Sequence, residues 1–368
     1  MDFSALLFFA FGITYIGGLV YVANQVEATR LKPQRANNSA PSQGNFASGM
    51  EISQAVVLRW LLYGLVGMMF SAGFVVLQTA LFVDMAGGLE GQAQFPLEDI
   101  QIDTSAALVV FGLAIVLSFL SFRLINSVRT RERLQGLIGA RGSYNPDSPV
   151  HTAAVILMLA IVVWTMASFL IQGGISGLAE DLAQQGFDPG DLLFEGTLRV
   201  MIVFLGVGLA IRRDWSQTME RLGLRIPTAQ DLTRGIGVGL LLILFMIVFG
   251  LIWQQTTAPD LLEEQTAANQ QLNQLFSSLP MAFLLAITAA VGEEIWIRGA
   301  LQPVFGILIS SLFFMLLHTQ VLLTPGTLLI LIVSLGLAWV RQTTSTTAAI
   351  IAHFVFNFIP LVFLQTVV

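Results

Sequence analysis

Several polar residues near the end of the chain are of the types that catalyse hydrolysis. Glu293 and Glu294 are adjacent within a long apolar run, and Arg298 follows on the same run. A charged group at the centre of a membrane helix costs roughly 2.5–3.5 kcal/mol, so a cluster of such groups indicates a functional site. Two of the three histidines of the chain, His318 and His353, lie in the apolar segments that follow.

Helical spacing predicts different surroundings for the two glutamates. Adjacent residues diverge by about 100° around a helix, whereas residues at i and i+4 lie on one face. Glu294 is therefore the expected partner of Arg298, and Glu293 is left free. On the last apolar segment, His353 and Asn357 have the same i,i+4 spacing and project together.

These residue types are compatible with two kinds of chemistry. A free carboxylate beside a histidine can hold and deprotonate a water molecule, which is the general-base arrangement of hydrolysis. A second histidine and an asparagine amide can donate hydrogen bonds to the oxyanion that forms when water attacks a carbonyl. In the alternative, Glu293, His318 and His353 are ligands of a zinc ion that activates the water. Spacing alone does not choose between the two.

The composition indicates an all-α, polytopic membrane protein. Hydrophobic residues make up 55% of the chain and charged residues only 11%, and apolar runs of about 20 residues recur along it. The net charge of −6 and the scattered arginines argue against a nucleic-acid partner. The absence of cysteine excludes disulfides, thiolate metal sites and a cysteine nucleophile.

The apolar runs predict about ten membrane spans. They are Phe3–Asn24, Ala55–Val83, Ser105–Leu124, Thr152–Gln172, Gly196–Ile211, Gly235–Trp253, Pro280–Val304, Gly306–His318, Thr327–Val340 and Thr346–Leu364. We divide them into two parts. Residues 1–195 form an N-terminal membrane bundle of four helices with no assigned function, and residues 196–368 form the part that contains the polar cluster.

The distribution of arginine predicts the orientation of the helices. Lysine and arginine occur in the loops at residues 25–50, 125–150 and 212–234, whereas the intervening loops have acids and neither of these bases. The positive-inside rule then places both termini outside, with Arg199 as the one discordant residue. A rise of 1.5 Å per residue puts the candidate site residues roughly 11–18 Å from the inner ends of their helices. The predicted site therefore lies within the bilayer and is reached from the inner side.

Three short motifs carry a resemblance to a known family. Residues Glu293 to Gly299 fit the pattern EExxxR, Phe314 to His318 fit FxxxH, and His353 to Asn357 fit HxxxN. In this order the motifs resemble those of the CPBP family, the CAAX proteases and bacteriocin-processing enzymes related to the Ras-converting CAAX endopeptidase. The resemblance extends roughly from Arg212 to the C-terminus. Ile297 departs from the pattern, because the family often has an aromatic residue before the arginine.

The resemblance implies an intramembrane endopeptidase without a metal, although a zinc-dependent metalloprotease stays open. The catalytic residues that the motif positions imply are Glu293, Glu294, Arg298, His318, His353 and Asn357. The first glutamate and the first histidine would activate water, and the second histidine and the asparagine would stabilise the oxyanion. Glu294 with Arg298 would complete the first motif. Phe314 is expected to serve packing only.

The resemblance also implies a location and a class of substrate. We expect a multi-pass protein of the bacterial cell membrane, surrounded by the lipid bilayer, that acts on a membrane-embedded or lipidated peptide or protein. Two alternatives remain. Buried acids and histidines also serve proton-coupled transporters, although the two halves of the chain show no repeat. The third candidate is a non-catalytic immunity or binding protein that keeps the motifs.

Overall fold

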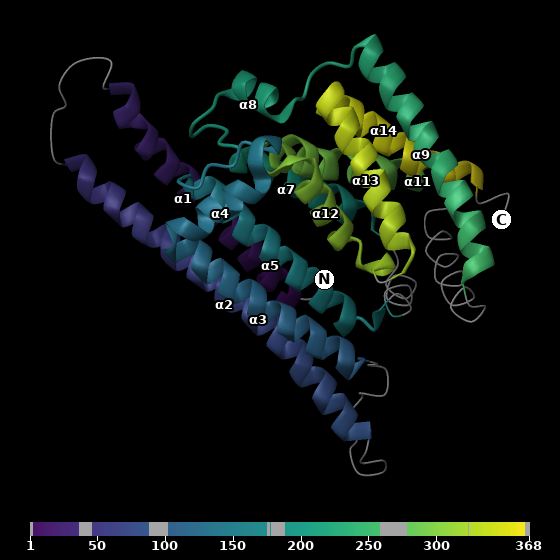
Figure 1. Ribbon diagram of the computed structural model, residues 1–368, viewed down its shortest axis with the longest axis horizontal. Coiled ribbons are helices and arrows are strands. Elements are labelled where there is room, and N and C mark those ends of the chain that lie inside the picture. Colours follow the sequence, from purple (N-terminus) through teal and green to yellow (C-terminus); the bar gives the residue numbers. More distant parts are fainter. Residues whose placement is uncertain are drawn as a thin grey trace.

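The computed structural model describes residues 3–36, 46–87, 102–174, 177, 188–257, 278–322 and 324–364. The regular elements within these ranges are helices (Figure 1). Of these, seven helical stretches are long and apolar enough to cross a membrane: Ser53–Met85, Thr104–Asn126, Pro149–Ile171, Ala229–Thr256, Leu279–Leu317, Gly326–Thr343 and Thr346–Phe363. The protein is therefore an all-α, multi-pass integral membrane protein, as its composition predicts.

The predicted number of ten spans is not confirmed. The expected spans Phe3–Asn24 and Gly196–Ile211 fall in helices α1 (Phe3–Ala36) and α7 (Pro189–Gly206), which are not among the seven candidates in the described residues. The expected spans Pro280–Val304 and Gly306–His318 fall together in the single stretch Leu279–Leu317. Apolar runs mark where helices are buried, but they do not show whether two consecutive runs belong to one stretch. The orientation of the termini stays a prediction.

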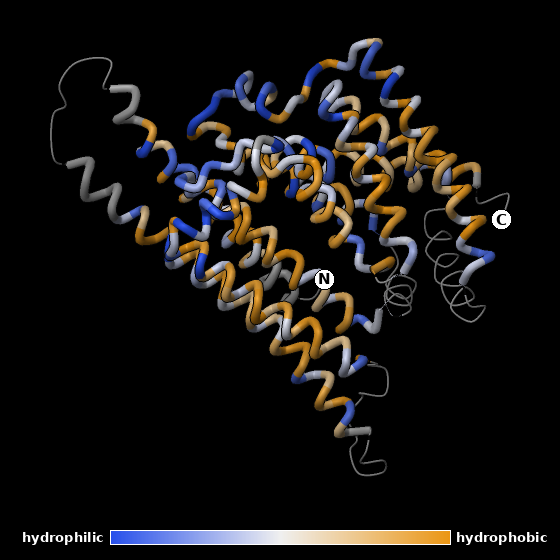
Figure 2. Tube along the Cα trace, viewed as in Figure 1, coloured by the Kyte–Doolittle hydropathy of each residue, from blue (hydrophilic) through white to orange (hydrophobic). Residues whose placement is uncertain are grey.

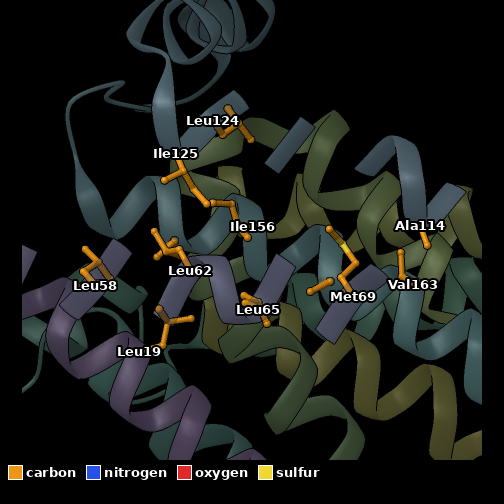
Figure 3. Close-up of a cluster of buried hydrophobic side chains, with 13 residues drawn as sticks. Leu19, Leu58, Leu62, Leu65, Met69, Ala114, Leu124, Ile125, Ile156 and Val163 are labelled. Carbon is orange, nitrogen blue, oxygen red and sulfur yellow. The ribbon is translucent and has the colours of Figure 1, made fainter. Parts of the chain in front are cut away.

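The first part of the chain forms a bundle around an apolar core. Its helices are α1, α2 (Phe46–Gly87), α3 (Thr104–Asn126) and α5 (Pro149–Ile171), and α2 and α3 lie side by side over much of their length (Figure 1). Buried side chains from all four helices meet in one cluster, among them Leu19, Leu65, Ala114 and Ile156 (Figure 3). Helices α2 and α3 approach so closely at Gly73 that a Cβ added there would lie 2.5 Å from the Cβ of Ala114. The predicted boundary after residue 195 stays a prediction.

Two short helices connect the long ones at one end of the molecule. They are α4 (Val128–Ile138) and α8 (Trp215–Leu222). Helix α8 begins with a capping box between Asp214 and Gln217 and ends at Gly223, which has a left-handed backbone with φ 67°. Figure 2 shows hydrophilic residues over α8 and the loops beside it, whereas the long helices are mainly apolar.

The second part of the chain contains the predicted site. Its long helices are α9 (Ala229–Thr256), α11 (Leu279–Glu294), α12 (Gln302–Leu317), α13 (Gly326–Thr343) and α14 (Thr346–Ile359). Helix α9 lies against α14 at two glycines. A Cβ at Gly235 would lie 2.8 Å from Ile351, and a Cβ at Gly239 would lie 2.8 Å from Val355. This small-xxx-small contact brings the α14 backbone close to α9.

The stretch Leu279–Leu317 changes its helical geometry next to the two glutamates. After α11 it continues as a π-helical segment, Ile295–Leu301, which we call η2, and the N–H of Gln302 donates to the carbonyl of Ile297. Within α12 the backbone breaks at Gly306, which has φ 78°. A Cβ at this position would lie 2.7 Å from the carbonyl oxygen of Arg141. Glycine is therefore required at the break, both for its backbone conformation and for this contact. Single-turn π segments occur frequently at functional sites.

Candidate active site

Glu294, Arg298 and His353 form a buried polar cluster. The Glu294 and Arg298 side chains are fully buried, and Oε2 of Glu294 lies 3.2 Å from Nε of Arg298. The other carboxylate oxygen, Oε1, lies 2.9 Å from Nδ1 of His353 on α14. The ion pair predicted from i,i+4 spacing is therefore present. The contact between Glu294 and His353 joins the end of α11 to α14, and it depends on the tertiary fold.

Arg298 joins the cluster to two further helices. Its Nη2 donates to the carbonyl oxygen of Ser334, at 3.2 Å, and to the Oγ of Ser334, at 3.0 Å, on α13. Its guanidinium carbon lies 5.0 Å from the ring centroid of Phe314 on α12, which is a cation–π geometry. The buried charge of Arg298 thus has one ion-pair partner, a serine and an aromatic face from three helical segments, although its buried Nη1 has no hydrogen-bond partner among the described residues.

The Phe314 ring lies at the centre of the site. Its centroid is 4.5 Å from the ring of His318 and 6.1 Å from the ring of His353. The side chain is 2% exposed. Phe314 thus packs, as expected, but it packs against both candidate histidines and Arg298. The motif FxxxH could have indicated this role, because residues at i and i+4 share a helix face.

Glu293 faces a different environment from that of its neighbour. Its side chain is 24% exposed and lines a cavity, and its Oε1 lies 4.0 Å from Nη1 of Arg199 on α7. Glu293 is left out of the Glu294–Arg298 pair, as predicted, but an arginine from another helix lies beside it. The physical reason is that α7 lies against α11, which brings the Arg199 side chain next to Gly292 and Glu293. The discordant position of Arg199 under the positive-inside rule was the sequence signal for this contact.

His318 lies at the C-terminal end of α12 and lines the same cavity as Glu293. Its Nδ1 is 2.8 Å from the carbonyl oxygen of Phe314. A carbonyl oxygen only accepts hydrogen bonds, so Nδ1 carries the proton in this contact. In the neutral ring, Nε2 then has a free lone pair and can accept a proton or a hydrogen bond from water.

The cavity has a volume of about 1010 Å³ and lies between the two parts of the chain. Helices α1, α5 and α7 contribute walls, and η2 and α12 complete it. Most of the lining is apolar, with residues such as Ile13, Leu157 and Ile202. Large apolar cavities with a few convergent polar groups are the usual form of ligand sites. The N-terminal helices, to which the sequence assigns no function, therefore help to enclose the candidate site.

His353 and Asn357 are not among the described residues that line this cavity. Both are on α14, and His353 is 4% exposed and bound to Glu294, whereas Asn357 is half-buried. The structure therefore brings Glu294, Arg298 and His353 together in a buried cluster and places Glu293 and His318 at the cavity. Among the described contacts, the Asn357 side chain belongs to neither group. The oxyanion role assigned to His353 and Asn357 stays a prediction.

The predicted zinc ligands do not form a three-ligand site. Among the described residues, no group of three or more histidines, aspartates or glutamates is placed to hold a metal ion. Glu293 and His318 line the cavity, but the Nδ1 of His353 is held by the buried Glu294. We therefore derive no catalytic step through zinc.

These features define the class of the protein, a multi-pass helical membrane protein with a polar cluster and a cavity enclosed by its helices. Residues 275–359 match the family model described as Type II CAAX prenyl endopeptidase Rce1-like. This part of the chain is a domain of that family, related to the CPBP proteins, and it contains all the predicted site residues from Glu293 to Asn357. Comparisons with curated proteins and with solved structures gave no match.

Proposed function

We propose that the protein is an intramembrane endopeptidase that hydrolyses a peptide bond in a membrane-associated or lipidated peptide or protein. The observation that carries this proposal is the cavity between the helices, which Glu293 and His318 line together. Both residues lie within the domain that matches the CAAX endopeptidase family. The apolar walls suit a substrate segment that itself prefers a membrane environment. A bacterial cell membrane is the location that we propose.

In this proposal a water molecule binds between Glu293 and His318. The Glu293 carboxylate removes a proton from the water as it attacks the carbonyl carbon, and the carboxylic acid later returns the proton to the leaving amine. The free Nε2 of His318 accepts a hydrogen bond from the other O–H of the water, and this contact orients the water. Arg199, at 4.0 Å, adds a positive charge beside the base.

In the proposal, groups on α14 supply the oxyanion site that acts when water attacks the carbonyl. The Glu294 carboxylate accepts the Nδ1–H of His353, so only a protonated ring also has a hydrogen on Nε2 to donate. The carboxylate at 2.9 Å complements that imidazolium ion. The His353 ring and the Asn357 amide, which lies one helical turn further on, would together stabilise the oxyanion of the tetrahedral intermediate.

The proposal is tested by comparing new peptide termini in membranes from cells that express the wild type or Glu293→Gln at equal levels. We expect termini that occur only with the wild type, because an amide side chain cannot act as the base. Such termini would also identify the substrate. If both proteins accumulate equally and no terminus differs, the endopeptidase proposal fails. Proton-coupled uptake into proteoliposomes that is lost in Glu293→Gln would then favour the transporter.

A further inference from the structure

A second group of charged residues lines the same cavity. Arg212, Arg213 and Arg221 contribute to its wall, and all three lie outside the matched domain. The first two belong to the tight turn after α7, and the third belongs to α8. None of them is used in the proposed hydrolysis.

The turn after α7 holds Arg212 and Arg213 in a defined position. The backbone N–H groups of both arginines donate to the carbonyl oxygen of Gly208, each at 2.9 Å. Gly208 has φ 97°, and a Cβ there would lie 2.9 Å from Oδ1 of Asn24. The buried Asn24 on α1 accepts from Nε of Arg212, at 2.7 Å, and donates to the carbonyls of Leu205 and Gly206, each at 3.1 Å. Asn24 therefore joins α1, the end of α7 and the arginine turn.

The arginines keep most of their hydrogen-bond donors available. A guanidinium group has five N–H donors. The described contacts use one of them on Arg212, with Asn24, and one on Arg213, with the carbonyl of Val207. Arg221 uses two, which donate to the carbonyls of Gly299 and Ala300 in η2 at 2.9 and 3.1 Å.

The local charge is unbalanced toward the positive side. Burial, followed by repulsion from the neighbouring arginines, lowers the pKa of Arg212 and of Arg221 to about 10, so both stay protonated near neutral pH. Among the described groups, the carboxylate that opposes this charge at Arg212 and Arg213 is Glu27, which also accepts from Ser148 at 2.9 Å. Three guanidinium groups, two of which are opposed by this one carboxylate, favour the binding of an anion.

The rest of the cavity identifies the kind of anion. Away from these arginines the wall also contains Glu195, Arg199, Glu293 and His318, and most of the remaining lining is apolar, with Ile13 and Ile16 from α1, Leu157 from α5 and Ile202 from α7. A ligand that fills both regions is an amphiphile with an anionic head and an apolar tail. Arginine forks match phosphate oxygens. Basic pockets between membrane helices on the cytoplasmic side bind anionic lipid headgroups, and the positive-inside rule places this arginine-rich end there.

We propose that Arg212, Arg213 and Arg221 bind the phosphate group of an anionic phospholipid whose acyl chain lies along the apolar walls formed by α1, α5 and α7. The lipid would occupy the part of the cavity that the N-terminal helices enclose. This inference does not depend on the endopeptidase proposal, because it rests on the turn, the charges and the walls alone.

The experiment is native mass spectrometry of the full chain, extracted in mild detergent and incubated with phosphatidylglycerol or phosphatidylcholine. The variants are Arg212→Gln/Arg213→Gln and, as a matched control, Arg129→Gln/Arg133→Gln. The control removes the same charge from exposed residues of α4 that are not part of the cavity wall. Each basic group near a headgroup contributes about a fivefold factor, so the first variant, which lacks two, should retain phosphatidylglycerol about 25-fold less than the wild type.

Retention of phosphatidylglycerol by the wild type and the control, with its loss in the cavity variant, supports the proposal. Equal retention by all three proteins would place the lipid elsewhere and overturn it. If no lipid is retained but inorganic phosphate raises the thermal stability of the wild type and not of the cavity variant, the ligand is free phosphate and the lipid assignment is wrong. Thermal unfolding of each variant without ligand shows that it is folded, and Arg212→Lys/Arg213→Lys should recover part of the retention.

Discussion

At the residue scale, the two adjacent glutamates illustrate how one helical step changes the chemistry available to a side chain. Glu294 is fully buried between Arg298 and His353, whereas Glu293 lies at the cavity with Arg199. Removing one partner of a buried ion pair leaves an uncompensated charge inside the protein. Removing a partly exposed carboxylate does not. The two positions should therefore respond differently to the same substitution.

Glu294→Gln should destabilise the fold by about 3–5 kcal/mol, because Arg298 and His353 lose their shared carboxylate. Glu293→Gln, on the partly exposed side, should cost about 1 kcal/mol or less. The measurement is thermal or denaturant unfolding of both variants in the same detergent. Equal losses of stability would contradict the different surroundings described here.

Arg199 was not predicted as a site residue, yet it is the charged group next to the proposed base. Arg199→Gln should lower kcat for cleavage about tenfold, which corresponds to about 1.4 kcal/mol in the barrier. The reason is that Glu293 loses the charged side chain that lies beside its carboxylate and orients it. Arg199→Lys keeps the charge and should recover part of the rate. Wild-type turnover in Arg199→Gln, measured on the substrate found by terminal analysis, would remove Arg199 from the mechanism.

At the element scale, the change of geometry between α11 and α12 positions the site. The stretch Leu279–Leu317 contains the two glutamates, the π-helical segment η2 and His318 close behind its end. The η2 segment is held from outside by Arg221, which donates to its carbonyls, and by the close contact of Gly299 with Leu222. The relative positions of Glu293 and His318 therefore depend on contacts between η2 and α8. A hydropathy pattern does not predict these contacts.

Gly306 is the element-scale position that is most sensitive to substitution. Gly306→Ala should cost about 1–3 kcal/mol, since a residue with a Cβ is strained at φ 78° and would contact the Arg141 carbonyl. Gly237→Ala is the matched control, because no atom lies within 4 Å of a Cβ at this helical glycine. Unfolding midpoints of the two variants test this. A loss in Gly237→Ala as large as that in Gly306→Ala would argue against backbone strain as the cause.

At the scale of the whole molecule, the cavity unites the two parts of the chain. The matched domain supplies Glu293 and His318, and the earlier helices α1, α5 and α7 supply the opposing walls and the arginine turn. A substrate or lipid that enters the cavity therefore contacts residues on both sides of the predicted boundary after residue 195. The peptide-terminus and lipid-retention experiments examine the two ends of this one cavity separately.

Much of the fold follows from patterns along the chain. Runs of apolar residues predict helices, and each predicted span overlaps a helix that the structure describes. The i,i+4 rule correctly pairs Glu294 with Arg298, because both residues belong to one helical stretch. The motifs predict the family, and residues 275–359, which contain them, match its family model.

The amino-acid sequence by itself determined the membrane class, the helices and the polar residues of the site, because these depend on composition and on spacing within one helix. Only the tertiary structure decided that Arg199 lies beside Glu293, that His353 binds Glu294, and that the cavity has walls from α1 and α5. These contacts join residues far apart in the chain. Their geometry depends on close helix packing and on the break at Gly306, which short-range patterns do not encode.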